Sequence, residues 1–445
     1  MNMKYRFTLL LISCISSYAL AQTTADLQLL QQAVSAQQLR QTVEKLVSFG
    51  TRHTLSDTTG ARRGIGAARR WAYQQFKSYS PRLQVSFDAF TVEPDGRRIP
   101  HKVEMKNVMA WLPGTDTGDR RVILITAHLD SRASDVMDAT IDAPGANDDG
   151  SGCALVMEAA RVLSQYEFPC SLLFVLFSGE EQGLYGSRHL AQKARQEGWE
   201  IVAVLNNDIV GNSYSSELGI RQNTRVRVFS EGIPAAADEQ TVRLLRLLGY
   251  ENESSSRQLA RYMADIARKH IPHLEVRMVY RKDRFLRGGD HTPFNEAGFT
   301  AIRVCEENED FTHQHQNVRT EKGIRYGDLP EFMDFDYLRK NTVLNVLTAA
   351  ALAWAPAAPQ NVSMSVSGLS NHTELRWQAP VAGPRPAYYR VLIRSTEAPQ
   401  WEQHIDTKDT AIRLPYSKDH YLFAVQSVSE AGFASLPVVP LPARE

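Results

Sequence analysis

Short apolar runs alternate with helical patterns through the middle of the chain. The apolar runs cover residues 121–127, 171–177, 201–206 and 300–304, and segments 152–166 and 183–197 have the spacing of helices. Strands that are apolar along their whole length are typical of a parallel sheet with helices on both faces. We therefore predict an α/β fold with a mostly parallel central sheet flanked by helices. Two further helices over 24–48 and 61–79, and a strand within 107–114, are expected before the first run.

The pattern changes at about residue 357, where short strands with alternating apolar and polar positions begin. These strands read ELRWQA, YYRVLIRS and YLFAVQSVS, and Trp377, Tyr389 and Tyr421 supply their large side chains. The spacing of these strands predicts a small C-terminal β-sandwich over 356–445, and the segment resembles a fibronectin type III module. Modules of this kind often bind another protein or a surface.

The first residues have the pattern of a secretory signal peptide. Lys4 and Arg6 precede an apolar run, and Ala19-Leu20-Ala21 form an A-x-A cleavage site. The run is too short and too rich in serine for a membrane span, so we expect cleavage near Ala21, a secreted or periplasmic protein and no transmembrane helix. The alternative is a lipoprotein anchored at Cys14, because the preceding residues resemble a bacterial lipobox. The predicted domains are a signal peptide (1–21), a main domain (22–355) and the β-sandwich (356–445).

The balance of charges and the cysteines add two constraints. The 445 residues include 50 basic and 50 acidic side chains, so nothing in the composition indicates nucleic acid or an anionic membrane as a partner. Beyond the signal peptide lie Cys153, Cys170 and Cys305. This odd number fits either one disulfide with a free thiol or three buried thiols.

Carboxylate and imidazole side chains follow the predicted strands of the main domain. In chain order they are His128 and Asp130, then Asp148 and Asp149 within PGANDDGSG, Glu180 and Glu181, Asp208, and finally His313 and His315. Because functional residues gather beyond the carboxyl ends of parallel strands, we expect these side chains to lie together. Carboxylates this close to one another need cations to neutralise them. Mixed nitrogen and oxygen ligands suit Zn²⁺, with Mn²⁺ or Co²⁺ as substitutes.

The motifs HLDS, PGANDDGSG, SGEEQGLYGS and LNNDIVG, with the late histidine loop, resemble the M28 family of zinc aminopeptidases in order and spacing. The similarity covers roughly residues 40–350, and the chain is expected to be a bacterial, secreted member. The resemblance implies two zinc ions per chain, bridged by Asp148.

In that family pattern, His128 and Asp208 would bind one ion, and Glu181 and a late histidine the other. The resemblance also implies Glu180 as the general base and Asp130 as the residue that orients His128. A cis peptide bond between Asp148 and Asp149 is expected, with small neighbouring residues that let the backbone approach the metals.

The late histidine has two candidates, because this chain reads HQHQNVRT where the family commonly has His-Thr-x-x-Asp-Thr. Alignment on Thr320 selects His315 as the ligand, which we favour. Alignment on Asn317 selects His313. The segment GGDHTPF is also similar to a family segment near the pocket, so Asp290 and His291 either shape the site or support it structurally.

The expected function is removal of N-terminal residues from peptides or proteins. Alternatives within the fold are a glutaminyl cyclase-like enzyme and a carboxypeptidase-like enzyme, the latter because of the arginine-rich segment YRKDRFLRGG. A secreted binding protein without activity is the alternative from another class. The pocket for the first substrate residue would come from loops within 210–300, so its preference does not follow from the sequence.

Overall fold

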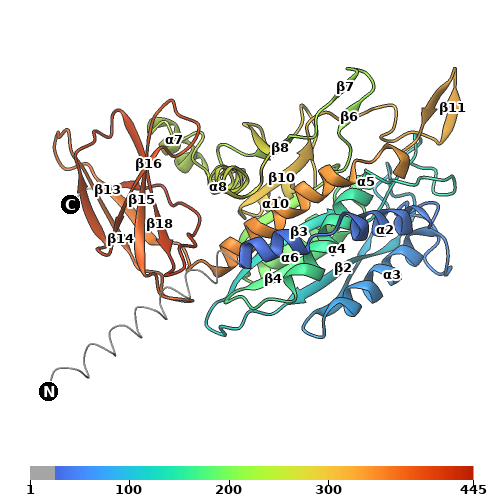
Figure 1. Ribbon diagram of the computed structural model, residues 1–445, viewed down its shortest axis with the longest axis horizontal. Helices are drawn as coiled ribbons and strands as arrows, with labels where there is room; N and C mark the ends of the chain where they lie inside the picture. The colour runs from blue at the N-terminus through green and yellow to red at the C-terminus, as the bar shows by residue number, and fades with distance from the viewer. Residues whose placement is uncertain (1–25, 444–445) are drawn as a thin grey trace. The chain divides into compact units, whose positions relative to one another are not determined.

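The computed structural model describes residues 26–443, which divide into two compact units (Figure 1). The larger unit comprises 34–115 and 120–349, and the smaller one 26–33, 116–119 and 350–443. The division falls within helix α10 (Phe335–Trp354), a few residues before the boundary predicted at 355. The predicted signal peptide and Cys14 lie outside the described residues.

The larger unit is built on an eight-stranded sheet with the order β1-β2-β4-β3-β5-β10-β8-β9. Its strands are β1 (Gln84–Val92), β2 (Val103–Leu112), β3 (Arg121–His128), β4 (Ser171–Phe177), β5 (Glu200–Asn207), β8 (Arg225–Ser230), β9 (Glu275–Val279) and β10 (Ala301–Glu306). The pairs β3–β4, β3–β5, β5–β10 and β8–β9 are parallel, and the other three pairs are antiparallel. The predicted α/β fold is confirmed, with a parallel centre and antiparallel pairs towards the edges.

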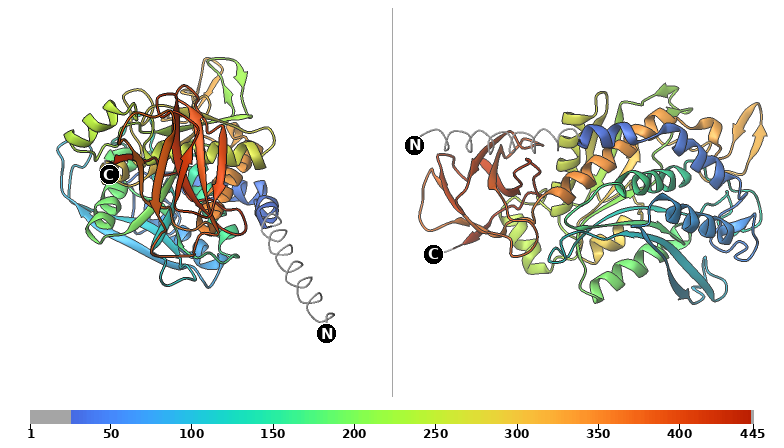
Figure 2. Two further views of the ribbon diagram at one scale, coloured as in Figure 1. Left: turned by 90° about the vertical axis from the view of Figure 1, so that its left-hand side faces the viewer. Right: turned by 60° about the horizontal axis from the view of Figure 1, so that its bottom comes forward.

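Helices cover both faces of this sheet, as the right-hand view of Figure 2 shows. They are α2 (Ala36–Val47), α3 (Gly64–Tyr79), α4 (Gly150–Leu163), α5 (Glu180–Gly183), α6 (Tyr185–Gln196), α7 (Glu239–Leu247), α8 (Ser255–His270), α9 (His291–Glu296), the 3₁₀ turn η1 (Pro330–Phe332) and α10. Two short hairpins complete the unit, β6 (Tyr214–Ser215) with β7 (Ile220–Arg221) and β11 (Arg319–Glu321) with β12 (Ile324–Tyr326).

The core of the larger unit explains why its central strands read as continuous apolar runs. Every residue of β3 is buried, and so is every residue of β4 after Ser171. On one face, Leu190 of α6 and Phe294 of α9 pack against Val122, Leu124 and their neighbours. Strands buried on both faces need no polar alternation, which is the pattern that predicted them.

The sheet edges and one helix differ from the sequence prediction. Strands β1, β8 and β9 were not predicted, because polar residues alternate with apolar ones along them; β1 and β9 form the two edges of the sheet. The single helix predicted over 24–48 is interrupted at Ser35, which caps α2 by accepting a hydrogen bond from the Gln38 N–H at 3.3 Å. A side chain that satisfies free N–H groups starts a new helix there.

The smaller unit contains two small sheets with a shared apolar core. One has the order β17-β14-β13-β19 and the other β16-β15-β18. The bounds are β13 (Gln360–Ser365), β14 (Thr373–Gln378), β15 (Tyr388–Ser395), β16 (Gln403–Thr407), β17 (Ala411–Leu414), β18 (Tyr421–Val428) and β19 (Leu441–Ala443). Trp377 from the first sheet meets Tyr389 from the second edge to face, with ring centroids 5.5 Å apart. The aromatic residues singled out in the sequence therefore belong to this core, with Tyr421 half-buried at its margin.

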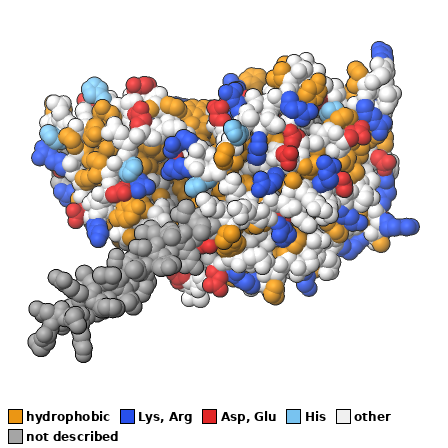
Figure 3. Space-filling view, viewed as in Figure 1, with side chains coloured by type: hydrophobic (Ala, Val, Ile, Leu, Met, Phe, Trp, Pro, Cys, Tyr) orange, Lys and Arg blue, Asp and Glu red, His pale blue; other side chains and the backbone are white. Residues whose placement is uncertain are grey.

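Three further observations bear on the sequence predictions. Cys153, Cys170 and Cys305 are all buried and no disulfide joins them, so the alternative of a disulfide among them is wrong. Within 26–443, no helix is long and apolar enough to cross a membrane. Basic and acidic side chains are interspersed on the face shown in Figure 3.

Candidate metal centre

The ends of three parallel strands and two loops bring the predicted site residues together. His128 is the last residue of β3, Glu180 and Glu181 open α5 after β4, and Asp208 follows β5. Asp148 immediately precedes Asp149, the N-cap of α4, and His315 lies in the loop after β10. These residues come from five separate segments of the chain. The carboxyl edge of the parallel strands collects them, as the sequence predicted.

Two groups of side chains have the spacing of metal sites. One group is His128, Asp149 and Asp208, and the other is Asp148, Glu181 and His315; within each group the candidate donor atoms lie within 4.8 Å of one another. Both groups combine one imidazole nitrogen with carboxylate oxygens, the ligand set that suits Zn²⁺. The residues present therefore fit zinc in both positions.

Asp148 lies between the two groups. Its Oδ1 is 3.2 Å from His128 Nε2, and its Oδ2 is 2.9 Å from His315 Nε2. Each oxygen of this one carboxylate thus faces a different imidazole. Such an arrangement allows a single side chain to serve two ions, in keeping with the bridging role that the resemblance implies.

Asp149 has a structural task, although it belongs to the first group by distance. Its Oδ2 accepts the N–H of His128 at 3.0 Å, and its Oδ1 accepts the N–H of Gly152 at 3.0 Å and that of Ile209 at 3.3 Å. The Asp149 carboxylate caps α4 and joins the loops after β3 and β5. The Asp148–Asp149 peptide bond is cis, as expected.

The small residues around Asp148 make room for buried polar groups. Gly145 has a φ of +52°, and a Cβ there would lie 2.9 Å from Nη2 of Arg52. A Cβ at Gly152 would lie 2.5 Å from Oδ1 of Asp149. The glycines in PGANDDGSG thus admit a guanidinium and a carboxylate, a packing reason that the sequence did not reveal.

The late histidine at the centre is His315. Its Nε2 is 3.0 Å from Oε1 of Glu181 as well as close to Asp148. His313 instead stacks on the ring of Phe332, with centroids 3.7 Å apart, and its Nδ1 is 3.8 Å from Asp310. The structure therefore brings His315 and not His313 to the two groups.

Asp130 holds His128 and also the turn that follows β4. The Nδ1 of His128 is 3.0 Å from the carbonyl oxygen of Asp130 and 3.7 Å from its Oδ1. A donor at Nδ1 leaves Nε2 as the lone-pair nitrogen that faces Asp148 and Asp208. The Asp130 carboxylate also accepts the N–H groups of residues 179, 180 and 181 at 3.1, 3.3 and 3.1 Å. It therefore fixes the turn that carries Glu180 and Glu181.

Uncompensated negative charge dominates the electrostatics of the centre. Burial opposes a charge on His128, but the surrounding carboxylates, Asp149 and Glu180 foremost, together outweigh burial and raise the pKa of His128 well above its usual value. Burial also raises the pKa of Glu180 well above its usual value, and Asp208 and Glu181 add to this rise. Divalent cations would relieve this repulsion.

Arg303 is a site residue that the sequence reasoning missed. Its buried guanidinium forms ion pairs with Oδ1 of Asp208 at 3.0 Å and with Oδ1 of Asp283 at 3.1 Å. Asp283 in turn meets Arg284, which pairs with Glu309 at 2.7 Å. An arginine inside a buried strand is the signal that could have found it, because such a charge requires partners.

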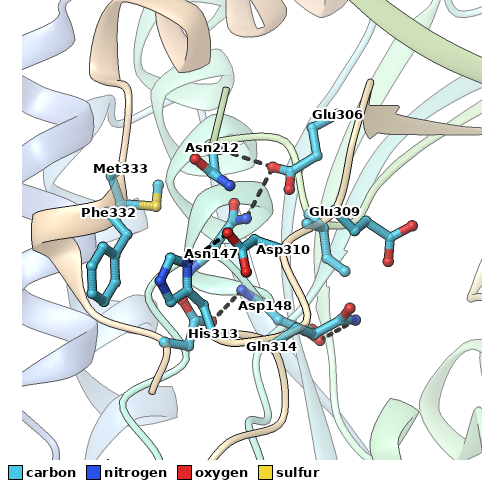
Figure 4. Close-up of a pocket in the computed structure, with 12 residues that line it drawn as sticks. Asn147, Asp148, Asn212, Glu306, Glu309, Asp310, His313, Gln314, Phe332 and Met333 are labelled. Carbon is cyan, nitrogen blue, oxygen red and sulfur yellow. Dashed lines mark hydrogen bonds and ion pairs between the residues drawn. The ribbon is translucent and has the colours of Figure 1, made fainter. Parts of the chain in front are cut away.

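Asp328 and a neighbouring polar pocket were also missed. The Asp328 carboxylate accepts the N–H of Asn147 at 2.8 Å and that of Asp148 at 2.7 Å. Figure 4 shows Glu306 between Asn147 and Asn212, whose N–H groups donate to its Oε2 at 2.9 and 2.8 Å. The contacts of Asp328 hold the backbone at Asn147 and Asp148, and Glu306 ties Asn147 to Asn212.

Asp290 and His291 of the GGDHTPF segment are both buried at the start of α9. Burial raises the pKa of Asp290 to about 7. The Nε2 of His291 is 2.7 Å from the carbonyl oxygen of Lys282 and 3.6 Å from Asp283. His291 therefore supports the loop that contains Asp283, the ion-pair partner of Arg303.

Comparison with known proteins agrees with this arrangement. The sequence profile of Peptidase family M28 matches residues 107–334. A probable zinc metalloprotease of Leptosphaeria maculans is 42% identical over 94% of this chain and 97% of its own length. One of Pyrenophora teres f. teres is 42% identical over 92% of this chain and 86% of its own length. These relatives are fungal, whereas a bacterial member was expected.

Solved structures share the fold. The LapA aminopeptidase of Legionella pneumophila has a TM-score of 0.53 at 20% identity, over 74% of this chain and 75% of that chain. A glutaminyl cyclase of Macrostomum lignano has a TM-score of 0.51 at 18% identity, over 73% of this chain and 91% of that chain. At these identities the likeness concerns the fold alone. From its sequence relatives and its site, the chain belongs to peptidase family M28 and is a zinc-dependent peptidase.

Proposed function

We propose that this chain is a secreted aminopeptidase with two zinc ions, which removes N-terminal residues from peptides. The observation that carries the proposal is the position of Asp148, whose two oxygens face His128 and His315 separately. In this proposal Asp148 would contribute a ligand oxygen to each ion. His128 and Asp208 complete one site, and Glu181 and His315 the other.

The zinc ions, when bound, supply Lewis acidity that polarises the scissile carbonyl and makes a water more acidic. Glu180 accepts the proton of the attacking water on its carboxylate and donates it to the leaving amine. Burial raises the pKa of Glu180, which makes its carboxylate a stronger proton acceptor than that of an ordinary glutamate. Asp130 keeps Glu180 in place through the backbone of α5.

The surplus of carboxylates supports an N-terminal substrate. An α-ammonium group gains from the carboxylates gathered at the centre, among them Asp148 and Asp208. A carboxypeptidase would need a cationic group for the substrate's carboxylate. Arg284 and Arg303, the arginines nearest to Asp208 in the ion-pair network, are already paired with acidic side chains.

A glutaminyl cyclase-like activity is the second candidate, since a cyclase shares the fold. A cyclase of this type uses one zinc ion. The presence of both His128 and Asp208 beside Asp148 favours two ions instead.

The experiment combines zinc content with blocked substrates. Purified protein is analysed for zinc per chain and assayed by mass spectrometry on one peptide in three forms: free, N-acetylated and C-amidated. The proposal expects two ions, cleavage of the free and amidated peptides, and no cleavage of the acetylated one. Cleavage of only the forms with a free C-terminus would establish a carboxypeptidase. Conversion of N-terminal glutamine to pyroglutamate with one ion would establish a cyclase.

Glu180→Gln separates an enzyme from a binding protein. The substitution removes the proton acceptor and keeps the size of the side chain, so kcat should fall by about 10² to 10⁴ with zinc content unchanged. Unchanged turnover in this variant would contradict the role of Glu180.

The proposal also includes export through residues 1–21, which N-terminal sequencing of the exported protein would test. It further includes a binding role for the C-terminal β-sandwich, which deletion of 356–445 would test.

A further inference from the structure

Residues 51–54 form a buried segment between α2 and α3 that reaches the candidate metal centre. This segment reads Thr-Arg-His-Thr and lies outside the residues matched by the family profile. Thr51, Arg52, His53 and Thr54 are each at most 4% exposed. The sequence predicted no role for this segment, although it is both polar and buried.

Arg52 joins the two ends of the loop between β3 and α4. Its Nε donates to the carbonyl oxygen of Leu129 at 2.8 Å, next to His128. Its Nη1 and Nη2 donate to the carbonyl oxygens of Pro144 and Gly145 at 2.6 and 2.9 Å, just before Asp148. One rigid guanidinium thus ties together the two ends of the single loop between β3 and α4.

Thr54 and His53 reach the turn after β4, which carries Glu181. The Thr54 hydroxyl donates to Oδ2 of Asp130 at 3.0 Å, and the same oxygen accepts the Glu181 N–H. His53 Nε2 lies 3.1 Å from Nε2 of Gln182 and 2.8 Å from the carbonyl oxygen of Val136. The segment therefore contacts the loop between β3 and α4, which follows His128 and carries Asp148, and the turn after β4 that carries Glu181.

We propose that residues 51–54 are positioning residues of the metal centre, with Arg52 and Thr54 setting the relative placement of the ligand loops. This inference rests on the proposed function for the roles of the ligands. Loops of this kind have no ladder of strand hydrogen bonds to fix them, and a metal site needs its ligands held within about 0.5 Å. Three carbonyl contacts and one carboxylate contact from a single segment provide that constraint.

The decisive variant is Thr54→Val, which keeps the shape of the side chain and removes the hydrogen bond to Asp130. Loss of a hydrogen bond behind a metal site costs about 10- to 100-fold in metal affinity or activity, and we expect about 10-fold here. Zinc affinity is measured by competition with a chromophoric chelator, and kcat and KM on an aminoacyl substrate. We expect weaker zinc binding and lower kcat, with KM within about 2-fold of the wild type.

Two control variants separate positioning from folding. Thr54→Ser keeps the hydroxyl and should restore both zinc affinity and kcat. Thr342→Val removes a buried hydroxyl that donates to the Leu338 carbonyl oxygen at 2.8 Å within α10. It should leave zinc affinity and kcat within about 2-fold. Equal losses in Thr54→Val and Thr342→Val would overturn the inference, and so would an unchanged Thr54→Val.

Arg52→Ala adds an independent test by chemical rescue. Millimolar guanidinium should restore part of the lost zinc affinity, because it can occupy the space left among the three carbonyl oxygens. Arg257→Ala is the matched control, since Arg257 is also buried and donates to the carbonyl oxygen of Ser230. Rescue of both variants alike, or of neither, would contradict a specific role for Arg52.

Measurements of zinc affinity distinguish failure of the positioning role from failure of the proposed function. A wild-type protein that binds zinc but cleaves no free N-terminus would remove the proposed function. Weaker zinc binding by Thr54→Val would still support the positioning role in that case.

Discussion

Removal of the Arg303 guanidinium should destabilise the protein in a way that depends on zinc. In Arg303→Met, the carboxylates of Asp208 and Asp283 lose a buried partner at 3.0 and 3.1 Å. Asp283 keeps Arg284 at 3.3 Å, while the other basic group near Asp208 is His128 at 3.9 Å. The free-energy cost therefore falls mainly on Asp208 unless a cation neutralises it.

The magnitude follows from the general cost of breaking a buried ion pair, about 3 to 5 kcal/mol. Bound zinc would compensate Asp208, so we expect a loss of about 3 kcal/mol in the zinc-loaded protein and about 5 kcal/mol after chelation. Arg303 also holds the pKa of Asp283 well below its usual value, against the effect of burial. The added substitution Asp283→Asn should therefore recover part of the loss.

Urea unfolding followed by circular dichroism measures these changes, with and without a chelator. Arg257→Met provides the control, because this buried arginine contacts Asn252 and a carbonyl oxygen rather than a candidate ligand. Its cost should be the same with and without zinc. A loss below about 1 kcal/mol for Arg303→Met, far under the cost of a broken buried pair, would refute the reasoning, as would equal losses in the two states.

Three further predictions use other parts of the chain. His315→Ala should lose one zinc ion per chain by elemental analysis and His313→Ala none; the reverse result would assign the ligand to His313. Burial raises the pKa of Glu231 from 4.5 to about 7, so its ionisation destabilises the fold increasingly as pH rises through this range. Glu231→Gln should therefore raise the free energy of unfolding by up to about 3 kcal/mol at pH 8 and leave it unchanged below pH 4, and urea titrations showing no pH dependence would contradict this. Burial raises the pKa of Cys305 to about 12, so the native thiol should resist a disulfide reagent at pH 8 that labels it after unfolding; rapid native labelling would show that it is accessible.

The central strands and the edge where the site forms were predictable from the sequence for a physical reason. Strands buried on both faces must be apolar throughout, so β3, β4 and β5 stand out, and the residues that follow them share one edge. The roles of Glu180 and Asp148 came from the resemblance to M28 enzymes rather than from periodicity. Neither the Val-Arg alternation in β8 nor the exposed positions of the edge strand β1 distinguish a strand from a loop.

Contacts between distant residues account for what the sequence did not reveal. Asp328 binds the backbone of Asp148 across 180 positions, and no local pattern marks such a pair. Arg303 stands out as an arginine within an apolar strand, but its partners Asp208 and Asp283 become evident only in the fold. The choice between His313 and His315 likewise depends on the path of one loop, which composition does not determine.

Strand β10 has a consequence for how the protein is made. It lies between β5 and β8 in the sheet, although its residues are synthesised after both. A growing chain that has not reached Glu306 therefore presents two open strand edges, next to Leu205 and Val228, which β10 later covers. Such edges favour aggregation, and non-local pairing of this kind slows folding. The larger unit should thus complete its sheet only late in translation, and chains that end before β10 should depend on chaperones to stay soluble.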